Sequence, residues 1–391
     1  MSGTGRLDSW KEIAHYLRRG VRTAQRWERD AGLPVRRVTA DGGAVYAFQS
    51  DIDAWWQRRG INDRPPRSRP PTTGPVPAPI DGTAFAVPVP APHGTRVQAF
   101  LSSNVRVDPD SAPGHANLAV YFFTLTAMGL IDPAEGMPAV RAAARRALSL
   151  DPANTEAGAL AALVLALYDH DWPNAERQFT TSMARAPISA LLRFHLAAWY
   201  LSPLERHEES IVQLRAALAH EPLYLLGRVQ IGMELCSLGR TDQGYAELED
   251  VLRIDPGFGP ALGHLGKERA LQGDAAAADT LSVRTYASIP EHPNAAGFRA
   301  GVLHIRGDHS AAGEILEKLA RDSPWAVPRA TAESHLVRGD FDAALECIAA
   351  AIALRDPGIW ILFAGTSGRR LRERPRWAAV REMLRLPSRT A

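Results

Sequence analysis

Residues 239–256 read GRTDQGYAELEDVLRIDP, a helical pattern that starts after a glycine and ends at an Asp-Pro pair. Both markers recur along the chain. Prolines return every 33 to 35 residues, at positions 152, 187, 222, 256, 290, 324 and 357, and glycines every 32 to 34, at 239, 273, 307 and 339. Glycine permits a sharp turn and proline cannot continue a helix. The spacing therefore predicts a helical hairpin that repeats in tandem.

Small and large residues keep the same phase within these units. The small ones fall where paired helices must approach, at Ala198, Gly232, Gly266, Ala175, Ala277, Ala312 and Ala344. In most units a large apolar residue follows four positions later, at Phe179, Leu214, Leu248, Leu281, Leu316 and Ile348. A small residue lets two backbones come close, and the large one fills the next groove. The pattern indicates close packing between neighbouring helices.

These features resemble tetratricopeptide repeats over about residues 98 to 360. The resemblance implies an α-solenoid whose first helices line a concave surface that binds a protein or peptide partner. By repeat phase, six side chains are candidates to line that groove: His195, Trp199, Met233, His264, Lys267 and His304. An alternative stays open, in which Trp199 and Met233 belong to the core between repeats.

The two ends of the array depart from the regular pattern. A first unit, with helices over residues 116–130 and 139–150, is expected to carry an insertion around Ile131-Asp132-Pro133. A last helix is expected from Arg374-Pro375 to about Leu384, as the cap that covers the final apolar face. Eight arginines lie between residues 369 and 389. They predict either a solvated basic cap or a second phosphate-binding patch.

The first sixty residues have a different character. LDSWKEIAHYL (7–17) and VRTAQRWERDAG (21–32) show helical spacing, and VRRVTADGGAVYAF (35–48) has the Asp-Gly-Gly signal of a hairpin. QSDIDAWWQRRG (49–60) predicts a third helix. In the second helix Val21, Ala24 and Trp27 can pack inward, which leaves an Arg- and Gln-rich outer face.

This order of segments resembles the MerR/excisionase-type winged helix-turn-helix over about residues 6 to 60. The resemblance implies double-stranded DNA as a partner, with a helix in the major groove and a hairpin wing beside it. The residues expected to contact bases are Arg22, Gln25 and Arg26, because Arg can form hydrogen bonds with the edge of guanine and Gln with the edge of adenine. Expected phosphate contacts are Thr23, Arg29, Arg36 and Arg37. The alternative is a docking head that binds only protein.

Charge divides the chain in the same place. Residues 1–69 hold fourteen Arg and Lys against eight Asp and Glu, although the whole protein carries a formal net charge of only +2. A basic excess confined to one part is the electrostatic footprint expected of a DNA-binding unit. Ten prolines between positions 65 and 92 then predict an extended spacer. The expected domains are 1–61, a linker over 62–97 and a repeat array over 98–391.

Motifs for catalysis are missing from the sequence. It has no H-E-x-x-H, zinc-spaced Cys/His cluster, phosphate loop or G-x-S-x-G elbow. Cys236 and Cys347 are expected to be buried thiols, and no metal or cofactor is expected. No apolar run is long enough for a membrane span, so the expected location is cytoplasmic, and nucleoid-associated when DNA is bound.

The prediction is therefore a mainly α protein with no enzymatic activity. It has a small winged helix-turn-helix of three helices and a hairpin, followed by an array of helical repeats. Its expected function is transcriptional regulation, with the array as a site for a partner or for homodimer formation. The alternative is a non-enzymatic scaffold whose head docks on protein.

Overall fold

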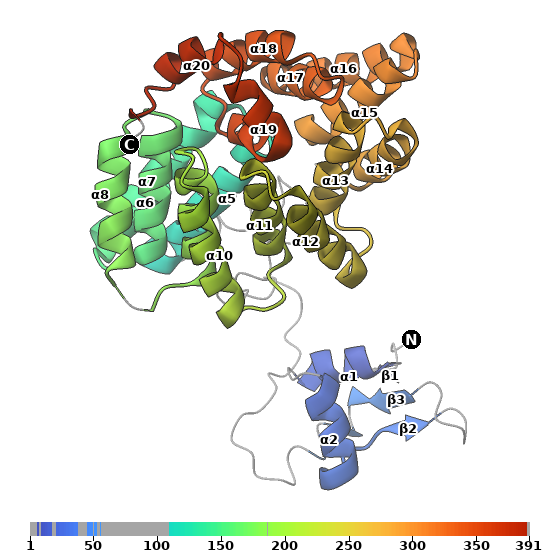
Figure 1. The fold of residues 1–391 in the computed structure, drawn as a ribbon. Coiled ribbons are helices and arrows are strands. Elements are labelled where there is room, and N and C mark those ends of the chain that lie inside the picture. The colour runs from blue at the N-terminus through green and yellow to red at the C-terminus, as the bar shows by residue number, and fades with distance from the viewer. Residues whose placement is uncertain are drawn as a thin grey trace. The chain divides into compact units, whose positions relative to one another are not determined.

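The computed structural model describes residues 6–7, 9–17, 21–37, 45–49, 51–52, 55, 109–185 and 187–388. The chain divides into two compact units, Met1–Pro75 and Val76–Ala391. Figure 1 shows the two units, and each is described by itself. The predicted spacer and the predicted Asp-Gly-Gly tip lie outside the described residues.

Among its described residues, the N-terminal unit packs helices α1 (Trp10–Leu17) and α2 (Val21–Ala31) on a small sheet. These helices contact each other, and strands β1 (Arg6–Leu7), β3 (Val45–Phe48) and β2 (Arg36–Arg37) form an antiparallel sheet in that order. Both helices and the β2–β3 pair lie where the sequence predicts them. Strand β1 was not predicted, because two residues hold a strand conformation only through pairing with a neighbour.

The core of this unit uses the predicted inward faces. Ile13 and Ala24 are fully buried, from α1 and α2 respectively. Of the third predicted helix, the structure describes Gln49, Asp51, Ile52 and Trp55, all helical. Ile52 is buried, and the Trp55 ring lies 5.9 Å from that of Trp27. These apolar contacts fix α2 against the rest of the unit and leave its opposite side outward.

The C-terminal unit is an array of helical hairpins. In the described part of the chain, residues 112–353 form seven helical hairpins. The first helix of the third hairpin continues as a π-helical stretch, η2 (Ala197–Leu201). In chain order the pairs are α5 (Ala112–Ala127) and α6 (Pro133–Leu150), α7 (Thr155–Leu167) and α8 (Trp172–Met183), α9 (Ala190–Leu196) and α10 (His207–His220), α11 (Leu225–Ser237) and α12 (Thr241–Ile254), α13 (Gly259–Leu271) and α14 (Ala275–Ser288), α15 (Pro293–Ile305) and α16 (His309–Asp322), and α17 (Val327–Val337) and α18 (Phe341–Ala353).

Backbone conformation explains the predicted repeat markers. The four phased glycines, at 239, 273, 307 and 339, each end a first helix with φ between +78° and +84°. That left-handed conformation strains any residue with a Cβ. Six of the phased prolines fall between one hairpin and the next, and Pro357 follows the last hairpin as the first residue of a 3₁₀ segment; no α-helical hydrogen bond is lost at these positions. The prediction of repeated helical hairpins is confirmed.

Two details of the predicted phase are wrong. Pro133 is the first residue of α6, with Asp132 as its N-cap, so the first hairpin needs no insertion there. In α14 the fully buried small residue is Ala278, whereas Ala277 is only partly buried. Pro is favoured at the first position of a helix, and a run of four alanines carries no signal that fixes the phase.

The chain end closes the array on itself. A 3₁₀ segment η4 (Pro357–Phe363), helix α19 (Gly365–Arg372) and helix α20 (Trp377–Met383) follow the last hairpin. We call residues 357–383 the C-terminal segment. It shares one apolar core with α5, α7, α8, α17 and α18, and Trp172 Nε1 donates to the Leu384 carbonyl at 2.9 Å. The last hairpin thereby joins the first, and the helices form a ring (Figure 1).

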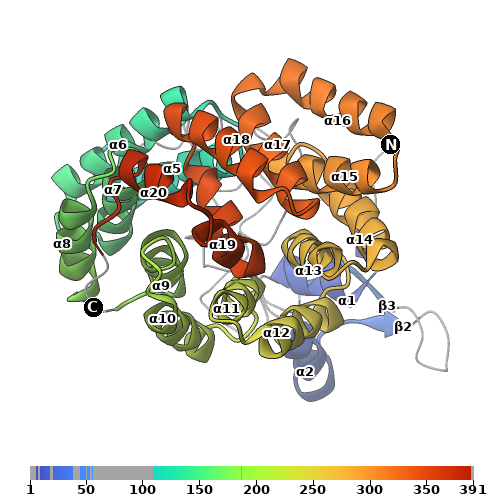
Figure 2. The ribbon, with the colours of Figure 1, turned by 45° about the horizontal axis from the view of Figure 1, so that its top comes forward.

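Helix α19 lies inside this ring (Figure 2), in contact with α11 and α13. The sequence predicted only one helix after the hairpins, over residues 374–384, and α20 is its shorter counterpart. It did not predict η4 or α19. The α19 sequence, GTSGRRLR, begins with four residues of lower helix propensity and has a single large apolar residue. Its helix depends on tertiary contacts.

The turn glycines give a direct test of the repeat geometry. Gly273 has φ of +84° and open space around it, so Gly273→Ala is expected to destabilise the array by about 1–2 kcal/mol through backbone strain alone. Gly313 also has open space but lies within α16, so Gly313→Ala is expected to stabilise by about 0.5–1 kcal/mol. Urea unfolding measures both. Equal effects of the two substitutions would contradict the left-handed turn.

Candidate functional site

The interior of the ring brings polar groups from distant repeats together. The Gly365 amide donates to Ser237 Oγ at 2.8 Å, and the Thr366 amide donates to Glu268 Oε1 at 3.0 Å. The other Glu268 oxygen accepts from the Tyr245 hydroxyl at 3.2 Å. The first amides of a helix have no partner within the helix and attract a carboxylate. Residues of α11 and α13 therefore supply the N-terminal cap of α19.

Arg329 joins three parts of the ring. This residue of α17 is fully buried, and its Nη1 donates to the Ala127 carbonyl at 2.7 Å and lies 3.3 Å from Asp356 Oδ1. A Cβ on Gly358 would overlap the guanidinium, so the backbone of η4 lies directly against it. Burial lowers the pKa of Arg329 and raises that of Asp356, and each charge offsets the penalty of the other. We call this contact the ring latch.

A second buried ion pair lies in the same interior. Lys267 Nζ is 3.2 Å from Glu333 Oε1, and these side chains are 1% and 4% exposed. The pair links α13 to α17. Lys267 was predicted to line an open groove, but it is enclosed and has a fixed partner. An ammonium group in this setting serves the packing of the array, because removal of either charge would leave the other buried alone.

The other predicted groove residues are dispersed. Met233 is fully buried beside Gly365, and His195 and Trp199 pack edge-on against Phe123, at 5.8 and 5.3 Å between ring centroids. Burial lowers the pKa of His195 to about 3.

The remaining two candidates, His264 and His304, are both partly buried. Burial, with nearby Lys267 and His292, lowers the pKa of His264 to about 3. His304 Nδ1 pairs with His309 Nδ1 at 2.9 Å where α15 meets α16. The six residues therefore do not form one open surface, because His195 and Trp199 pack on α5, Lys267 pairs with α17 and Met233 lies against α19.

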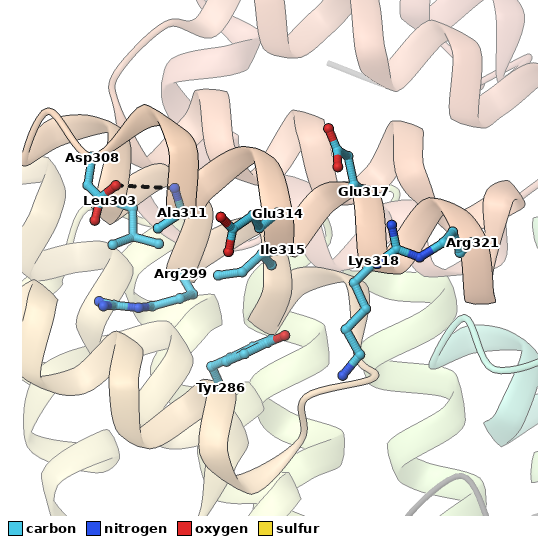
Figure 3. A pocket seen from close by; sticks show the side chains of 10 residues that line it. All are labelled: Tyr286, Arg299, Leu303, Asp308, Ala311, Glu314, Ile315, Glu317, Lys318 and Arg321. Carbon is cyan, nitrogen blue, oxygen red and sulfur yellow. Dashed lines mark hydrogen bonds between the residues drawn. The ribbon is translucent and has the colours of Figure 1, made fainter.

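A hollow of about 570 Å³ lies elsewhere, between α14, α15 and α16 (Figure 3). Arg299 on its wall is already paired with Asp279 at 2.6 Å, and Asp308 caps the Ala311 amide at 3.1 Å. The full lining is Tyr286, Arg299, Leu303, Asp308, Ala311, Glu314, Ile315, Glu317, Lys318 and Arg321.

The N-terminal unit places some of the predicted DNA contacts outward. On α2, Gln25 is partly exposed and Arg29 is exposed. Arg36 on β2 is exposed as well, but it forms an ion pair with Asp51 at 2.8 Å and lies over the Phe48 ring. This pairing was not predicted, because a hairpin strand and a helix start have no sequence signal that joins them. Side chains of the remaining candidates, Arg22, Thr23, Arg26 and Arg37, lie outside what the structure describes.

The C-terminal arginines are largely structural. Arg372 and Arg381 both contact Glu205, at 3.5 and 3.4 Å, and Arg376 pairs with Glu346. Arg370 and Arg374 lie over the Phe341 ring. These contacts fix the C-terminal segment to the third and last hairpins. They leave fewer guanidinium groups for the second phosphate-binding patch that the sequence raised as a possibility.

Several functions have no support in the described residues. No group of three or more His, Cys, Asp or Glu side chains there could hold a metal ion. None of the helices in the described ranges has both the length and the apolar character needed to cross a membrane. Cys236 is buried and Cys347 partly buried, both as free thiols, and burial raises the pKa of Cys236 to about 12.

No protein-family model and no curated protein matches this chain. Among solved structures it is similar to the type IV pilus biogenesis factor PilW, at 21% identity over 55% of this chain and 94% of that chain (TM-score 0.42). Yeast Tom70 is similar at 13% identity over 74% and 61% of the two chains (TM-score 0.45). The human IFIT1 dimer with PPP-AAAA is similar at 15% identity over 68% and 69% (TM-score 0.48). The repeat assignment rests on this chain's own hairpins.

The ring latch predicts a strong and coupled effect on stability. Arg329→Leu leaves the Asp356 carboxylate buried without a partner, and we expect a loss of about 3–5 kcal/mol in the free energy of unfolding. Asp356→Asn in the same chain removes that charge but keeps an acceptor for the Gly358 amide, so the double variant should recover part of the loss. Urea unfolding of the four proteins measures the coupling. Additive effects would contradict a direct pair.

Buried histidines predict that acid destabilises the array. Unfolded His195 takes up a proton below its ordinary pKa of 6.5, whereas the folded residue does so only near 3. The free energy of unfolding is therefore unaffected by this residue above pH 6.5. Below that pH it falls, and the loss from this residue reaches about 2 kcal/mol at pH 5. His195→Leu should flatten the urea-unfolding profile between these pH values by that amount. His220→Gln, at an exposed position in α10, is the control, and an unchanged profile in His195→Leu would contradict the assignment.

Proposed function

We propose that this protein acts by binding, as a non-enzymatic helical-repeat platform for a protein partner, with the N-terminal unit as a second docking module. The observation that carries the proposal is that the polar groups inside the ring bind other parts of the same chain. Glu268, Arg329 and Lys267 each contact another part of the same chain, so these interior charges are used within the fold. Arrays of helical hairpins offer large and rigid surfaces that suit protein partners.

Crosslinking tests this platform role. The full chain carrying a photoreactive group is expected to crosslink one protein at defined positions of the array, and the crosslink should persist after nuclease treatment. Substitution of the crosslinked surface residues should abolish it without a change in the unfolding curve. Diffuse crosslinks to many proteins, unaffected by those substitutions, would contradict a specific platform.

A second candidate function is DNA binding by the N-terminal unit as a winged helix-turn-helix. The α1–α2 pair, the outward Gln25 and Arg29 on α2, and the basic excess of residues 1–69 favour it. In this proposal α2 enters the major groove, where Arg22, Gln25 and Arg26 contact bases. Phosphate contacts then come from Thr23, Arg29, Arg36 and Arg37. A unit this small binds weakly alone, so a homodimer formed through the array would raise the affinity.

DNA retention separates the two candidates. If the N-terminal unit binds DNA, random-sequence duplex should retain the full chain at low salt and release it steeply as salt rises. Arg26→Ala should weaken binding to a selected site by about 1–3 kcal/mol with an unchanged unfolding curve. Asp51→Ala frees Arg36 from its ion pair and should strengthen the salt-dependent binding. Retention that does not respond to salt or to either substitution would favour protein docking.

A further inference from the structure

The contact between α19 and the concave face of the ring has an unusual composition. Helix α19 buries Gly365, Thr366, Ser367 and Gly368, which have small or polar side chains, and one large apolar residue, Leu371. Leu371 belongs to the core shared with the first and last hairpins, rather than to the core of α11 to α14. The contact of residues 365–368 with α11 and α13, which we call the α19 seam, therefore gains little from hydrophobic burial.

Two oriented acceptors hold the seam together. Ser237 Oγ accepts from the Gly365 amide while it donates to the Met233 carbonyl at 3.0 Å. Glu268, 1% exposed, accepts from the Thr366 amide, and its second oxygen is fixed by Tyr245, which in turn accepts from Gln272 Nε2 at 2.8 Å. Ser237 and Glu268 accept hydrogen bonds from main-chain amides of α19 and not from its side chains. The face can therefore accept any helix start of the same shape.

Shape restricts which helix starts fit. Gly365 has φ of +75°, and a Cβ there would lie 2.5 Å from Met233 Cε and 2.9 Å from Glu268 Oε1. A glycine is thus required at the first position of the helix, and the residue after it must supply a free amide. This requirement defines the chemistry of the occupant as closely as the two acceptors do.

The α19 seam also contains a buried polar group without a hydrogen-bond partner. Thr366 Oγ1 is buried and has no hydrogen-bond partner. An unpartnered buried hydroxyl costs free energy that water returns when the contact opens. Together with the small apolar area, it leaves the α19 seam with less to hold it closed than the contacts between hairpins, which bury large apolar cores.

We propose that Met233, Ser237 and Glu268 form a receptor for the amino-terminal end of a helix, filled here by the chain's own α19. A partner protein displaces α19 by presenting a glycine-led helix start with two free amides. This inference rests on the proposed platform function, and it identifies the part of the array that the partner contacts. The C-terminal segment then acts as an internal competitor that keeps the receptor closed until the partner arrives.

A matched pair of substitutions tests the internal contact in the full chain. Thr366→Pro removes the N–H group that donates a hydrogen bond to Glu268. The position is near the helix start, where proline is tolerated. Hydrogen exchange of residues 367–372 and 233–238 is expected to rise at least tenfold. Thr366→Ala keeps the amide and removes only the unpartnered hydroxyl, so exchange should stay equal or slow down. Equal exchange in both variants would overturn the proposal.

A peptide tests the receptor itself. A labelled peptide of residues 364–376, AGTSGRRLRERPR, is expected to bind the Thr366→Pro chain at least tenfold more tightly than the unaltered chain, as measured by anisotropy. The same peptide with proline at its third position should not bind, nor should a scrambled peptide of the same charge. Glu268→Ala in the Thr366→Pro chain should abolish binding. Equal binding of all three peptides would overturn the receptor.

Further outcomes of these experiments show which helix start occupies the receptor. If Thr366→Pro does not fold, as circular dichroism would show, Gly365→Ala replaces it, since a Cβ there would overlap Met233 Cε and strain the left-handed backbone of α19, while the receptor residues stay unaltered. A stable dimer of the opened chain would overturn the partner assignment, because α19 of a second copy would then fill the receptor. Failure of the peptide test leaves the platform function standing, with binding elsewhere on the array. The platform function fails separately if the opened and unaltered chains both crosslink no specific protein.

Discussion

The buried guanidinium of Arg329 is the contact on which the form of the array depends. It reaches from α17 to the Ala127 carbonyl in the first hairpin and to Asp356, the residue directly before the C-terminal segment. A solenoid without such a contact stays open, since each hairpin touches only its neighbours. Buried ion pairs add little net stability, but they tolerate few alternative arrangements. The latch acts together with the apolar core that the C-terminal segment shares with the first and last hairpins, and both hold the ring closed.

Closure changes the role of the concave face. In an open array the first helices would present Met233, Lys267 and His195 to a ligand. In the ring Met233 lies against Gly365, Lys267 pairs with Glu333 and His195 packs on Phe123. Glu268 illustrates the change, because a carboxylate that faced a groove now caps the amino-terminal end of α19. The same acceptors that stabilise the ring are the groups that another helix start would need.

The N-terminal unit is organised by a different constraint. In the residues that the structure describes, helices α1 and α2 and three short strands enclose a small core, in which Ile13, Ala24 and Ile52 are fully buried. The inward face of α2 is thereby fixed, and the opposite side carries Gln25 and Arg29 outward. Arg36 is held by Asp51, so a phosphate at that position would have to compete with a carboxylate.

Local chemistry in the sequence determined the hairpins, their length and their turns, because a left-handed glycine or a proline acts on its own backbone whatever surrounds it. It also determined the inward face of α2, through the spacing of Val21, Ala24 and Trp27. The tertiary structure alone decided the closure of the ring, the place of α19 and the burial of the predicted groove residues. The pairs responsible, such as Arg329 with Ala127 or Thr366 with Glu268, lie about a hundred residues or more apart. Polar contacts over such separations leave no periodic pattern, because they depend on how the curvature of every intervening hairpin adds up.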